Sequence, residues 1–213
     1  MNTQLLEENW QKMGERYNPD SGHYLSDVPL QGKDSEGRVF FRGILQEMAK
    51  ARELFILDCG CATGVDYSSL REVPNIKYQG IDWTSKFIQQ ALITFGEDAP
   101  FQVGSILNIP FEDRAFDLVY ERHVLEHLQD LEDMNKALAE MARVTKKHLV
   151  LIFASAPGDH TVIRTHDHKG IELPTNVYSR LDVTSCLSEL GFTFTVCTAV
   201  GGDTIYMCRR VEV

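Results

Sequence analysis

Two patterns of apolar and polar positions alternate along the chain. Short runs of strand-forming residues are separated by segments in which apolar residues have helical spacing. The first pattern is typical of strands buried in a sheet, and the second is typical of helices that pack on one. The strand-like runs cover 54–58, 76–82, 101–106, 116–120 and 148–154, and the helix-like segments cover 3–17, 38–52, 65–71, 85–95, 131–144 and 177–190.

This alternation predicts an α/β fold with a mostly parallel sheet. The last two strand-like runs, 192–199 and 204–208, lie on either side of Gly201-Gly202-Asp203 and predict a hairpin. At 213 residues the chain suits one domain. We divide it into an N-terminal segment, 1–52, with two helices joined by a loop-like stretch, and a core, 53–213.

The strongest local signal runs from Leu54 to Gly64, where an apolar strand ends in an acid and a turn of small residues. The order is Asp58-x-Gly60-x-Ala62-x-Gly64. Glycines permit backbone dihedrals that a side chain forbids and let a ligand approach the main chain. A Gly-rich turn after a parallel strand is where doubly wound folds bind adenosine cofactors. The carboxylate would repel a pyrophosphate and attract a cation, which disfavours an NAD-type dinucleotide.

This run resembles motif I of the class I S-adenosylmethionine-dependent methyltransferases, with Ala62 in place of a common glycine. Asp82-Trp83-Thr84 resembles the post-I motif of that family, 109–120 resembles its "LPF…FDLV" run, and 121–128 resembles the "hvLEHl" pattern of its small-molecule group. The resemblance implies a Rossmann-like, doubly wound, seven-stranded sheet, mostly parallel, with an antiparallel C-terminal strand at the edge. It also implies S-adenosylmethionine as the cofactor.

The resemblance implies a set of cofactor-binding residues at the carboxyl ends of the strands. Asp82, 18 residues beyond Gly64, would accept the ribose hydroxyls, unless it only caps the helix that follows. Trp83 would lie beside the adenine. The Ser105 hydroxyl, where many members have Asp, or the backbone near Ile106 would hold the adenine. The full expected set is Asp58, Gly60, Cys61, Ala62, Gly64, Asp82, Trp83, Ser105, Ile106 and Glu121.

Methyl transfer to a hydroxyl also needs a base close to the transferred methyl. Glu121 and Arg122 are expected to emerge at that point. The candidate bases are His123, Glu121 and a loop histidine, His160 or His166, and the sequence does not rank them.

An alternative function for residues 121–128 is to bind a divalent metal ion. His123, Glu126 and His127 would share one face of a helix at i, i+3 and i+4. The same short motif also occurs in metal-independent relatives, so we predict no metal.

Class I methyltransferases commonly use an N-terminal segment as a lid over cofactor and acceptor. By that resemblance, residues 1–52 are expected to include a lid. The candidate pocket residues in it are Trp10, Tyr17, His23 and Tyr24.

The amino-acid composition limits the classes of partner that we expect. The formal net charge of −10 disfavours nucleic acid, because phosphate binding needs clustered Lys and Arg. The small basic groups, Arg143 with Lys146-Lys147 and Arg209-Arg210, are interpreted as solvated surface. Five irregularly spaced cysteines do not form a disulfide framework. With an acidic N-terminus and no apolar run of membrane-spanning length, we expect a cytoplasmic protein. The sequence does not give the oligomeric state and leaves a monomer and a homodimer open.

Three functions remain open from the sequence. The first is a methyltransferase acting on the oxygen or nitrogen of a small or medium-sized metabolite. Residues 175–180 resemble a methyltransferase found beside surface-polysaccharide enzymes, which adds a sugar or lipid-linked acceptor as an option. The second is a non-catalytic cofactor-binding subunit, suggested by the departures at Ser105 and Lys146-Lys147. The third is an NAD-dependent oxidoreductase, which the glycine spacing disfavours.

Overall fold

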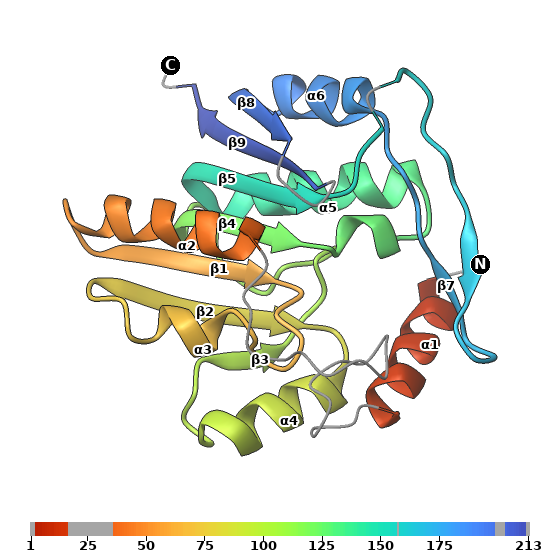
Figure 1. Cartoon of the computed structure of the whole chain (residues 1–213), viewed down its shortest axis with the longest axis horizontal. Coiled ribbons are helices and arrows are strands. Elements are labelled where there is room, and N and C mark those ends of the chain that lie inside the picture. The colour runs from red at the N-terminus through yellow and green to blue at the C-terminus, as the bar shows by residue number, and fades with distance from the viewer. Residues whose placement is uncertain (1–2, 17–35, 157, 199–202, 212–213) are drawn as a thin grey trace.

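The computed structural model describes residues 3–16, 36–156, 158–198 and 203–211. Within this part, helices and strands alternate along the chain (Figure 1). The helices are α1 (Thr3–Glu15), α2 (Glu36–Ala49), α3 (Tyr67–Leu70), α4 (Ser85–Phe95), α5 (Leu131–Val144) and α6 (Arg180–Glu189), with a 3₁₀ turn, η1, at Leu125–His127. The strands are β1 (Leu54–Cys59), β2 (Ile76–Asp82), β3 (Phe101–Val103), β4 (Phe116–Arg122), β5 (Thr145–Phe153), β6 (Thr165–Asp167), β7 (Glu172–Pro174), β8 (Phe192–Thr198) and β9 (Thr204–Arg210).

Seven of the described strands form one sheet in the order β3-β2-β1-β4-β5-β9-β8. The first five are parallel, whereas β9 is antiparallel to both of its neighbours. The predicted class, a Rossmann-like seven-stranded sheet that is mostly parallel, is confirmed. The expected edge position of the last strand is wrong, because β9 lies between β5 and β8. The buried side chains of Ile205, Tyr206 and Cys208 explain why β9 occupies an interior position.

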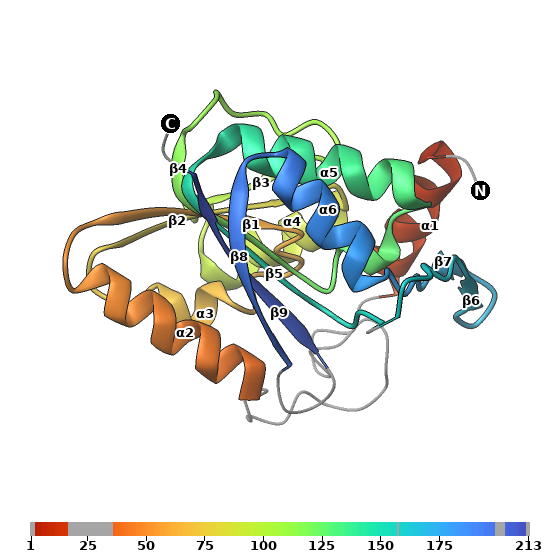
Figure 2. The same cartoon turned by 90° about the horizontal axis from the view of Figure 1, so that it is seen from above.

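Helices cover both faces of the sheet, as the alternating sequence pattern predicts. In the view from above, α2 and α3 lie on one face and α5 and α6 on the other (Figure 2). The first face buries Phe41 and Leu45 of α2 against Ile56. The second buries Met141 of α5 against Val119. The strands are therefore buried on both faces, which leaves the strand ends as the place for a ligand.

Helix α1 closes the carboxyl end of the sheet, where it packs against α4 and β7 (Figure 1). The Asn9 Nδ2 donates to the carbonyl oxygen of Glu172 over 2.9 Å. The Gln11 Nε2 donates to the carbonyl oxygen of Trp83 over 2.9 Å. An apolar cluster supports these bonds; it contains Leu6, Trp10, Met13, Phe87, Ile171 and Leu173.

Two local expectations differ from the structure. The helix expected to carry His123, Glu126 and His127 is a single 3₁₀ turn, because the Glu121 carboxylate accepts the N–H groups of Val124 and Leu125, and Leu128 is extended. The second is His166, expected in a loop, which lies in the short β6–β7 pair. Lys146-Lys147 is part of β5, which starts directly after α5. Tyr17, His23 and Tyr24 lie outside the described residues.

In the part of the chain that the structure describes, no helix combines the length and apolar character needed to cross a membrane.

Candidate functional site

A cleft lies at the carboxyl ends of the central parallel strands, beneath α1. It holds about 550 Å³ of space, including the part open to solvent. Its described lining residues come from α1, α4, η1 and the ends of β1 to β4: Trp10, Gly60, Asp82, Trp83, Phe87, Gly104, Ile106, Arg122, His123, Val124, His127 and Leu128.

The glycine turn after β1 contributes one residue, Gly60, to this cleft. Gly60 has φ +84°, and a Cβ added there would lie 2.2 Å from Cγ2 of Val124. Gly64, with φ +81°, has a different role: an added Cβ would lie 2.6 Å from the Phe101 ring. Gly60 therefore permits close approach at the cleft, whereas Gly64 permits aromatic packing behind it.

Asp82 is at the end of β2, and both oxygens of its carboxylate are held by backbone amides. Oδ1 accepts from Thr84 N over 2.8 Å, and Oδ2 accepts from Ala62 N over 3.0 Å. Burial raises the pKa of Asp82 to about 6, against the lowering effect of these bonds. A carboxylate has about four acceptor positions, so two remain for a pair of ligand hydroxyls. Asp82 does not cap α4, because Thr84 occupies the N-cap position.

The walls of the cleft beside Asp82 are largely apolar. Trp83, Ile106 and Leu128 line it, and Gly104 exposes bare backbone. Ser105 is not among the described lining residues, because its hydroxyl accepts from Leu107 N over 3.2 Å within its own turn. Trp83 and Ile106 are in the cleft, whereas an adenine contact through the Ser105 hydroxyl, whose O–H donor is not used by this bond, stays a prediction.

Two further residues of the glycine turn face away from the cleft. The Asp58 carboxylate accepts from the Tyr78 hydroxyl over 2.6 Å, and it is buried. Burial, and then the charge of Asp66, raise the pKa of Asp58 to about 7. The Cys61 side chain packs against Gly80. Both side chains support the turn from behind, and a contribution of Asp58 and Cys61 to cofactor binding stays a prediction.

A buried charge cluster lies behind the cleft, and the sequence analysis missed it. Asp66 Oδ1 lies 2.7 Å from Arg38 Nε and 2.9 Å from Arg122 Nη2. Asp66 Oδ2 accepts from Arg122 Nε over 3.2 Å. Arg122 also lines the cleft. Its guanidinium therefore combines a fixed orientation with access to a ligand carboxylate. The three residues lie far apart in sequence, so no local motif marks them.

Glu121 is fully buried, and its carboxylate is used by the backbone. Oε2 accepts from Val124 N over 3.0 Å and from Leu125 N over 3.3 Å, while Oε1 accepts from Ile152 N over 3.0 Å. Burial raises the pKa of Glu121 to about 7. Glu121 is not among the described lining residues. The expectation that it emerges at the reacting methyl is therefore corrected: it shapes the η1 turn.

His123 lines the cleft with both ring nitrogens facing carboxylates. Its Nδ1 lies 3.2 Å from Glu126 Oε1, and its Nε2 lies 3.4 Å from Asp203 Oδ2. Its backbone is left-handed, with φ 58°. Burial lowers the pKa of His123. The hydrogen bond to Glu126 and the negative charges of Glu126 and Asp203 together raise it by more, so the net shift is upward.

His127 also lines the cleft, but its ring has different partners from that of His123. Its Nδ1 lies 2.8 Å from the carbonyl oxygen of Pro174, and its ring makes an edge contact with Trp10 at 5.2 Å between centroids. Burial lowers the pKa of His127. Its Nε2 lies 3.8 Å from Glu126 Oε1.

Within the described ranges, no group of three His, Cys, Asp or Glu side chains could hold a metal ion. The predicted helical face shared by His123, Glu126 and His127 is not formed. Glu126 and His127 belong to a 3₁₀ turn, and His123 lies before that turn with a left-handed backbone.

The two loop histidines are not among the described lining residues. His160 has a side chain that is 90% exposed and lies 3.4 Å from Asp159. His166 is in β6 and is exposed. A catalytic role for either one is not supported by their positions.

Comparisons with known proteins find similarity to methyltransferases. A profile of the family described as "Methyltransferase domain" matches residues 57–153. The O-methyltransferase cnsE of Penicillium expansum is 29% identical to this chain over a match that covers 53% of this chain and 42% of the length of cnsE. The ajmaline N-methyltransferase of Rauvolfia serpentina is 32% identical over 54% of this chain and 37% of its own. The chain thus spans roughly two fifths of the length of these curated relatives.

Among solved structures, a similar one is magnesium protoporphyrin IX methyltransferase (ChlM) of Synechocystis PCC 6803 with bound SAH. It has a TM-score of 0.68 and 16% identity, and the match covers 99% of this chain and 100% of that one. This similarity extends the shared fold over almost the whole chain.

Proposed function

We propose that this chain is a class I S-adenosylmethionine-dependent methyltransferase that transfers the cofactor's methyl group to an oxygen or nitrogen of a small molecule. The observation that carries the proposal is Asp82, whose carboxylate is fixed by two backbone amides at the end of β2 and lines the cleft. A buried acceptor in that position suits a ribose diol.

The described lining residues offer the kinds of contact that this cofactor needs. Asp82 would hold the ribose hydroxyls, Trp83 and Ile106 would flank the adenine, and Gly60 would let the main chain approach the ligand. Arg122, held by Asp66, would bind the carboxylate of the amino-acid tail. When bound, the cofactor supplies an electrophilic methyl group on a sulfonium. The protein then has to hold the nucleophile in line and exclude water.

We assign the base to His127 in preference to His123. The carbonyl oxygen of Pro174 can only accept a hydrogen bond, so Nδ1 of His127 carries the proton and Nε2 keeps a lone pair. The lowered pKa keeps this ring neutral. His123 faces a carboxylate at each nitrogen, which favours the imidazolium, and an imidazolium has no lone pair to accept a proton. The acceptor's proton therefore moves to Nε2 of His127.

The acceptor is proposed to enter beside α1. Trp10 contacts the His127 ring from α1, and Phe87 and Leu128 add apolar surface. An acceptor with an apolar or aromatic body and one hydroxyl or amine group suits these walls. In this proposal the N-terminal segment, 1–52, provides one wall of the acceptor site through α1.

We further propose that the protein works in the cytoplasm without nucleic acid. The five cysteines are free thiols, as expected in a reducing compartment. The net charge of −10 opposes nucleic-acid binding.

A calorimetric titration tests the proposal. The full chain is titrated with S-adenosylmethionine, S-adenosylhomocysteine and NAD, before and after chelator treatment. We expect both methyl-cofactor forms to bind, NAD not to bind, and the chelator to have no effect. Transfer of a labelled methyl group is then measured on a panel of phenols and amines. Failure of both methyl-cofactor forms to bind would overturn the proposal, and binding without transfer to any acceptor would indicate a non-catalytic subunit.

A further inference from the structure

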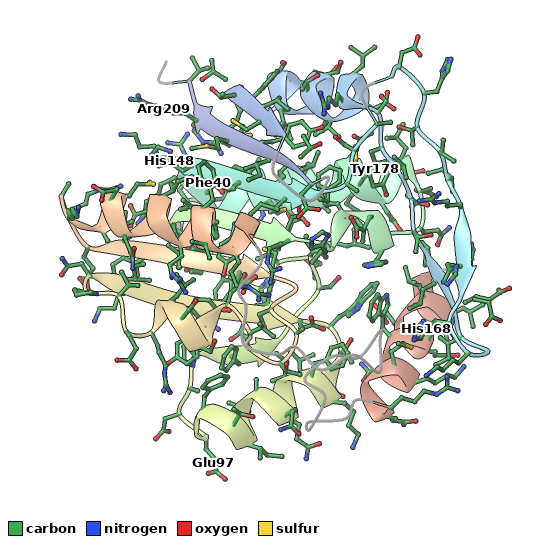
Figure 3. The ribbon with its side chains drawn as sticks, in the orientation of Figure 1. Phe40, Glu97, His148, His168, Tyr178 and Arg209 are labelled. Carbon is green, nitrogen blue, oxygen red and sulfur yellow. The ribbon has the colours of Figure 1, made fainter. Side chains whose placement is uncertain are left out.

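A second hollow lies at the opposite end of the sheet, at the amino ends of the parallel strands. It holds about 1200 Å³ of space, including the part open to solvent. Its described lining residues are Arg52, Arg114, Asp117, Lys146, Lys147, Gly191, Arg210 and Val211. Figure 3 shows the labelled side chains of His148 and Arg209 at this end of the sheet, far from His168 beside α1. Five of the lining residues are cationic, and we call this site the basic hollow.

Tertiary structure assembles the basic hollow from separate parts of the chain. Arg52 follows α2, Arg114 precedes β4, Lys146 and Lys147 open β5, and Arg210 ends β9. The antiparallel pairing of β5 with β9 sets His148 opposite Arg209, and this register brings the end of β9 to the start of β5. Two short basic runs that look like ordinary solvated surface in the sequence therefore share one concave site.

The positive charge of the described lining residues exceeds their negative charge. Among the described lining residues Asp117 is the one acid, and its carboxylate is already engaged. Oδ1 accepts from Arg52 Nη1 over 3.0 Å, and Oδ2 accepts from Phe55 N over 3.0 Å. Five cations against one carboxylate leave an excess of four positive charges. This excess contrasts with the net charge of −10 for the whole chain.

Arg210 is held in place within the hollow. Its Nη2 donates to the carbonyl oxygens of Ala142 and Thr145, and its guanidinium lies 4.6 Å from the centroid of the Phe192 ring. Its Nε is buried without a hydrogen-bond partner among the described residues. Burial and then the charge of Arg114 lower the pKa of Arg210. The positive charges of Arg114 and Arg210 therefore repel each other, and a bound anion would reduce this repulsion.

We propose that the basic hollow binds a multivalent phosphate group, supplied as a free oligophosphate or as a phosphate headgroup of a lipid. A guanidinium fork and lysine ammonium groups are the usual phosphate ligands in proteins. An excess of several positive charges in a concave site favours a ligand that concentrates negative charge in a small volume. The site is at the other end of the sheet from the cleft, so it does not depend on the proposed methyl transfer.

The test uses the full chain with two probes. Inorganic pyrophosphate is titrated by calorimetry, and binding to phosphatidylcholine vesicles containing phosphatidic acid is measured by sedimentation. The Lys146→Glu/Lys147→Glu variant is compared with Lys86→Glu/Lys136→Glu, which makes the same change in net charge at exposed lysines of α4 and α5. Arg114→Gln is a milder second variant, and circular dichroism confirms that each variant is folded.

We expect wild type to bind at least one probe, and the Lys146→Glu/Lys147→Glu variant to bind it about tenfold more weakly or worse. Binding should also be lost at about 0.5 M sodium chloride, where charges are screened within a few ångströms. Saturable pyrophosphate binding would identify a free oligophosphate, whereas binding to vesicles alone would identify a headgroup.

Three results would overturn the proposal. The first is no binding of either probe to wild type. The second is equal weakening in the Lys86→Glu/Lys136→Glu control, which would mean that only net charge matters. The third is binding of polyglutamate but not of either phosphate probe, which would identify an acidic polypeptide as the partner.

Discussion

The ring of His127 is bound to the backbone of Pro174, with 2.8 Å between Nδ1 and the carbonyl oxygen. His127 belongs to η1 and Pro174 to β7, so a contact across 47 residues selects the tautomer of a histidine that lines the cleft. Four residues earlier in the chain, His123 is paired with carboxylates at both nitrogens. The partners of these two histidines therefore shift their pKa values in opposite directions, that of His127 downward and that of His123 upward.

This difference can be measured without knowing the acceptor. In nitrogen-detected NMR near pH 6.5, we expect His127 to be neutral with its proton on Nδ1 and His123 to be mostly charged, because the pKa of His127 is lowered and that of His123 is raised. His127→Gln and His123→Gln assign the two sets of signals. If His127 proved the more basic of the two, its assignment as the base would be wrong.

Removing the Asp82 carboxylate should weaken cofactor binding. A hydrogen bond to a charged group is worth about 1.5–3 kcal/mol, so Asp82→Ala should lower the affinity for S-adenosylhomocysteine by roughly ten- to a hundredfold. Calorimetry measures the change, and Asp98→Ala, at an exposed turn, is the control. Unchanged affinity in Asp82→Ala would refute the ribose role.

Gly60 should not tolerate a side chain. Gly60→Ala adds a Cβ at φ +84° that would lie 2.2 Å from Cγ2 of Val124. Gly170→Ala is matched in backbone, with φ +83°, but it has no neighbour within 4 Å. The strained backbone should cost about 1–2 kcal/mol of unfolding free energy in both variants. The clash should cost Gly60→Ala about 1–3 kcal/mol more. Denaturant unfolding provides the comparison, and equal losses would contradict it.

Asp58 should make folding stability depend on pH. Its pKa is raised to about 7 in the folded protein from an ordinary value of 3.8. The folded state therefore binds more protons between these values, so Asp58 contributes stability at low pH that is lost as pH rises through about 7. Asp58→Asn does not titrate, and its stability relative to wild type should improve from pH 5 to pH 8. Thermal midpoints across this range check the sign, and a constant difference would contradict it.

The buried Asp66 should matter far more than an exposed partner of arginine. Asp66→Asn leaves Arg38 and Arg122 facing a neutral amide in a buried site. Breaking a buried ion pair costs about 3–5 kcal/mol. Asp113→Asn removes an equivalent contact to Arg143, but the Asp113 side chain is 76% exposed, so the cost should be below about 1 kcal/mol. Urea unfolding of both variants tests this contrast. Similar losses would mean that burial does not govern this cluster.

The sequence alone determined the parallel core, the glycine turn after β1 and the carboxylate at the end of β2. These features depend on residues close together in the chain. A buried strand needs a continuous apolar run, and a turn beneath a ligand needs glycine at a left-handed position. Gly60 and Asp82 therefore lie at the cleft that the local pattern predicts.

Which polar side chains share a site depends on contacts between segments that are distant in the chain. Asp58 is one residue before the end of β1 and Asp82 ends β2, yet Asp58 is bonded to Tyr78 while Asp82 lines the cleft. Glu121 is used by three backbone amides, one of them on β5. The direction of a side chain, and the charge that it meets, depend on packing between distant segments. For the same reason the basic hollow and the Asp66 cluster have no local signature in the sequence.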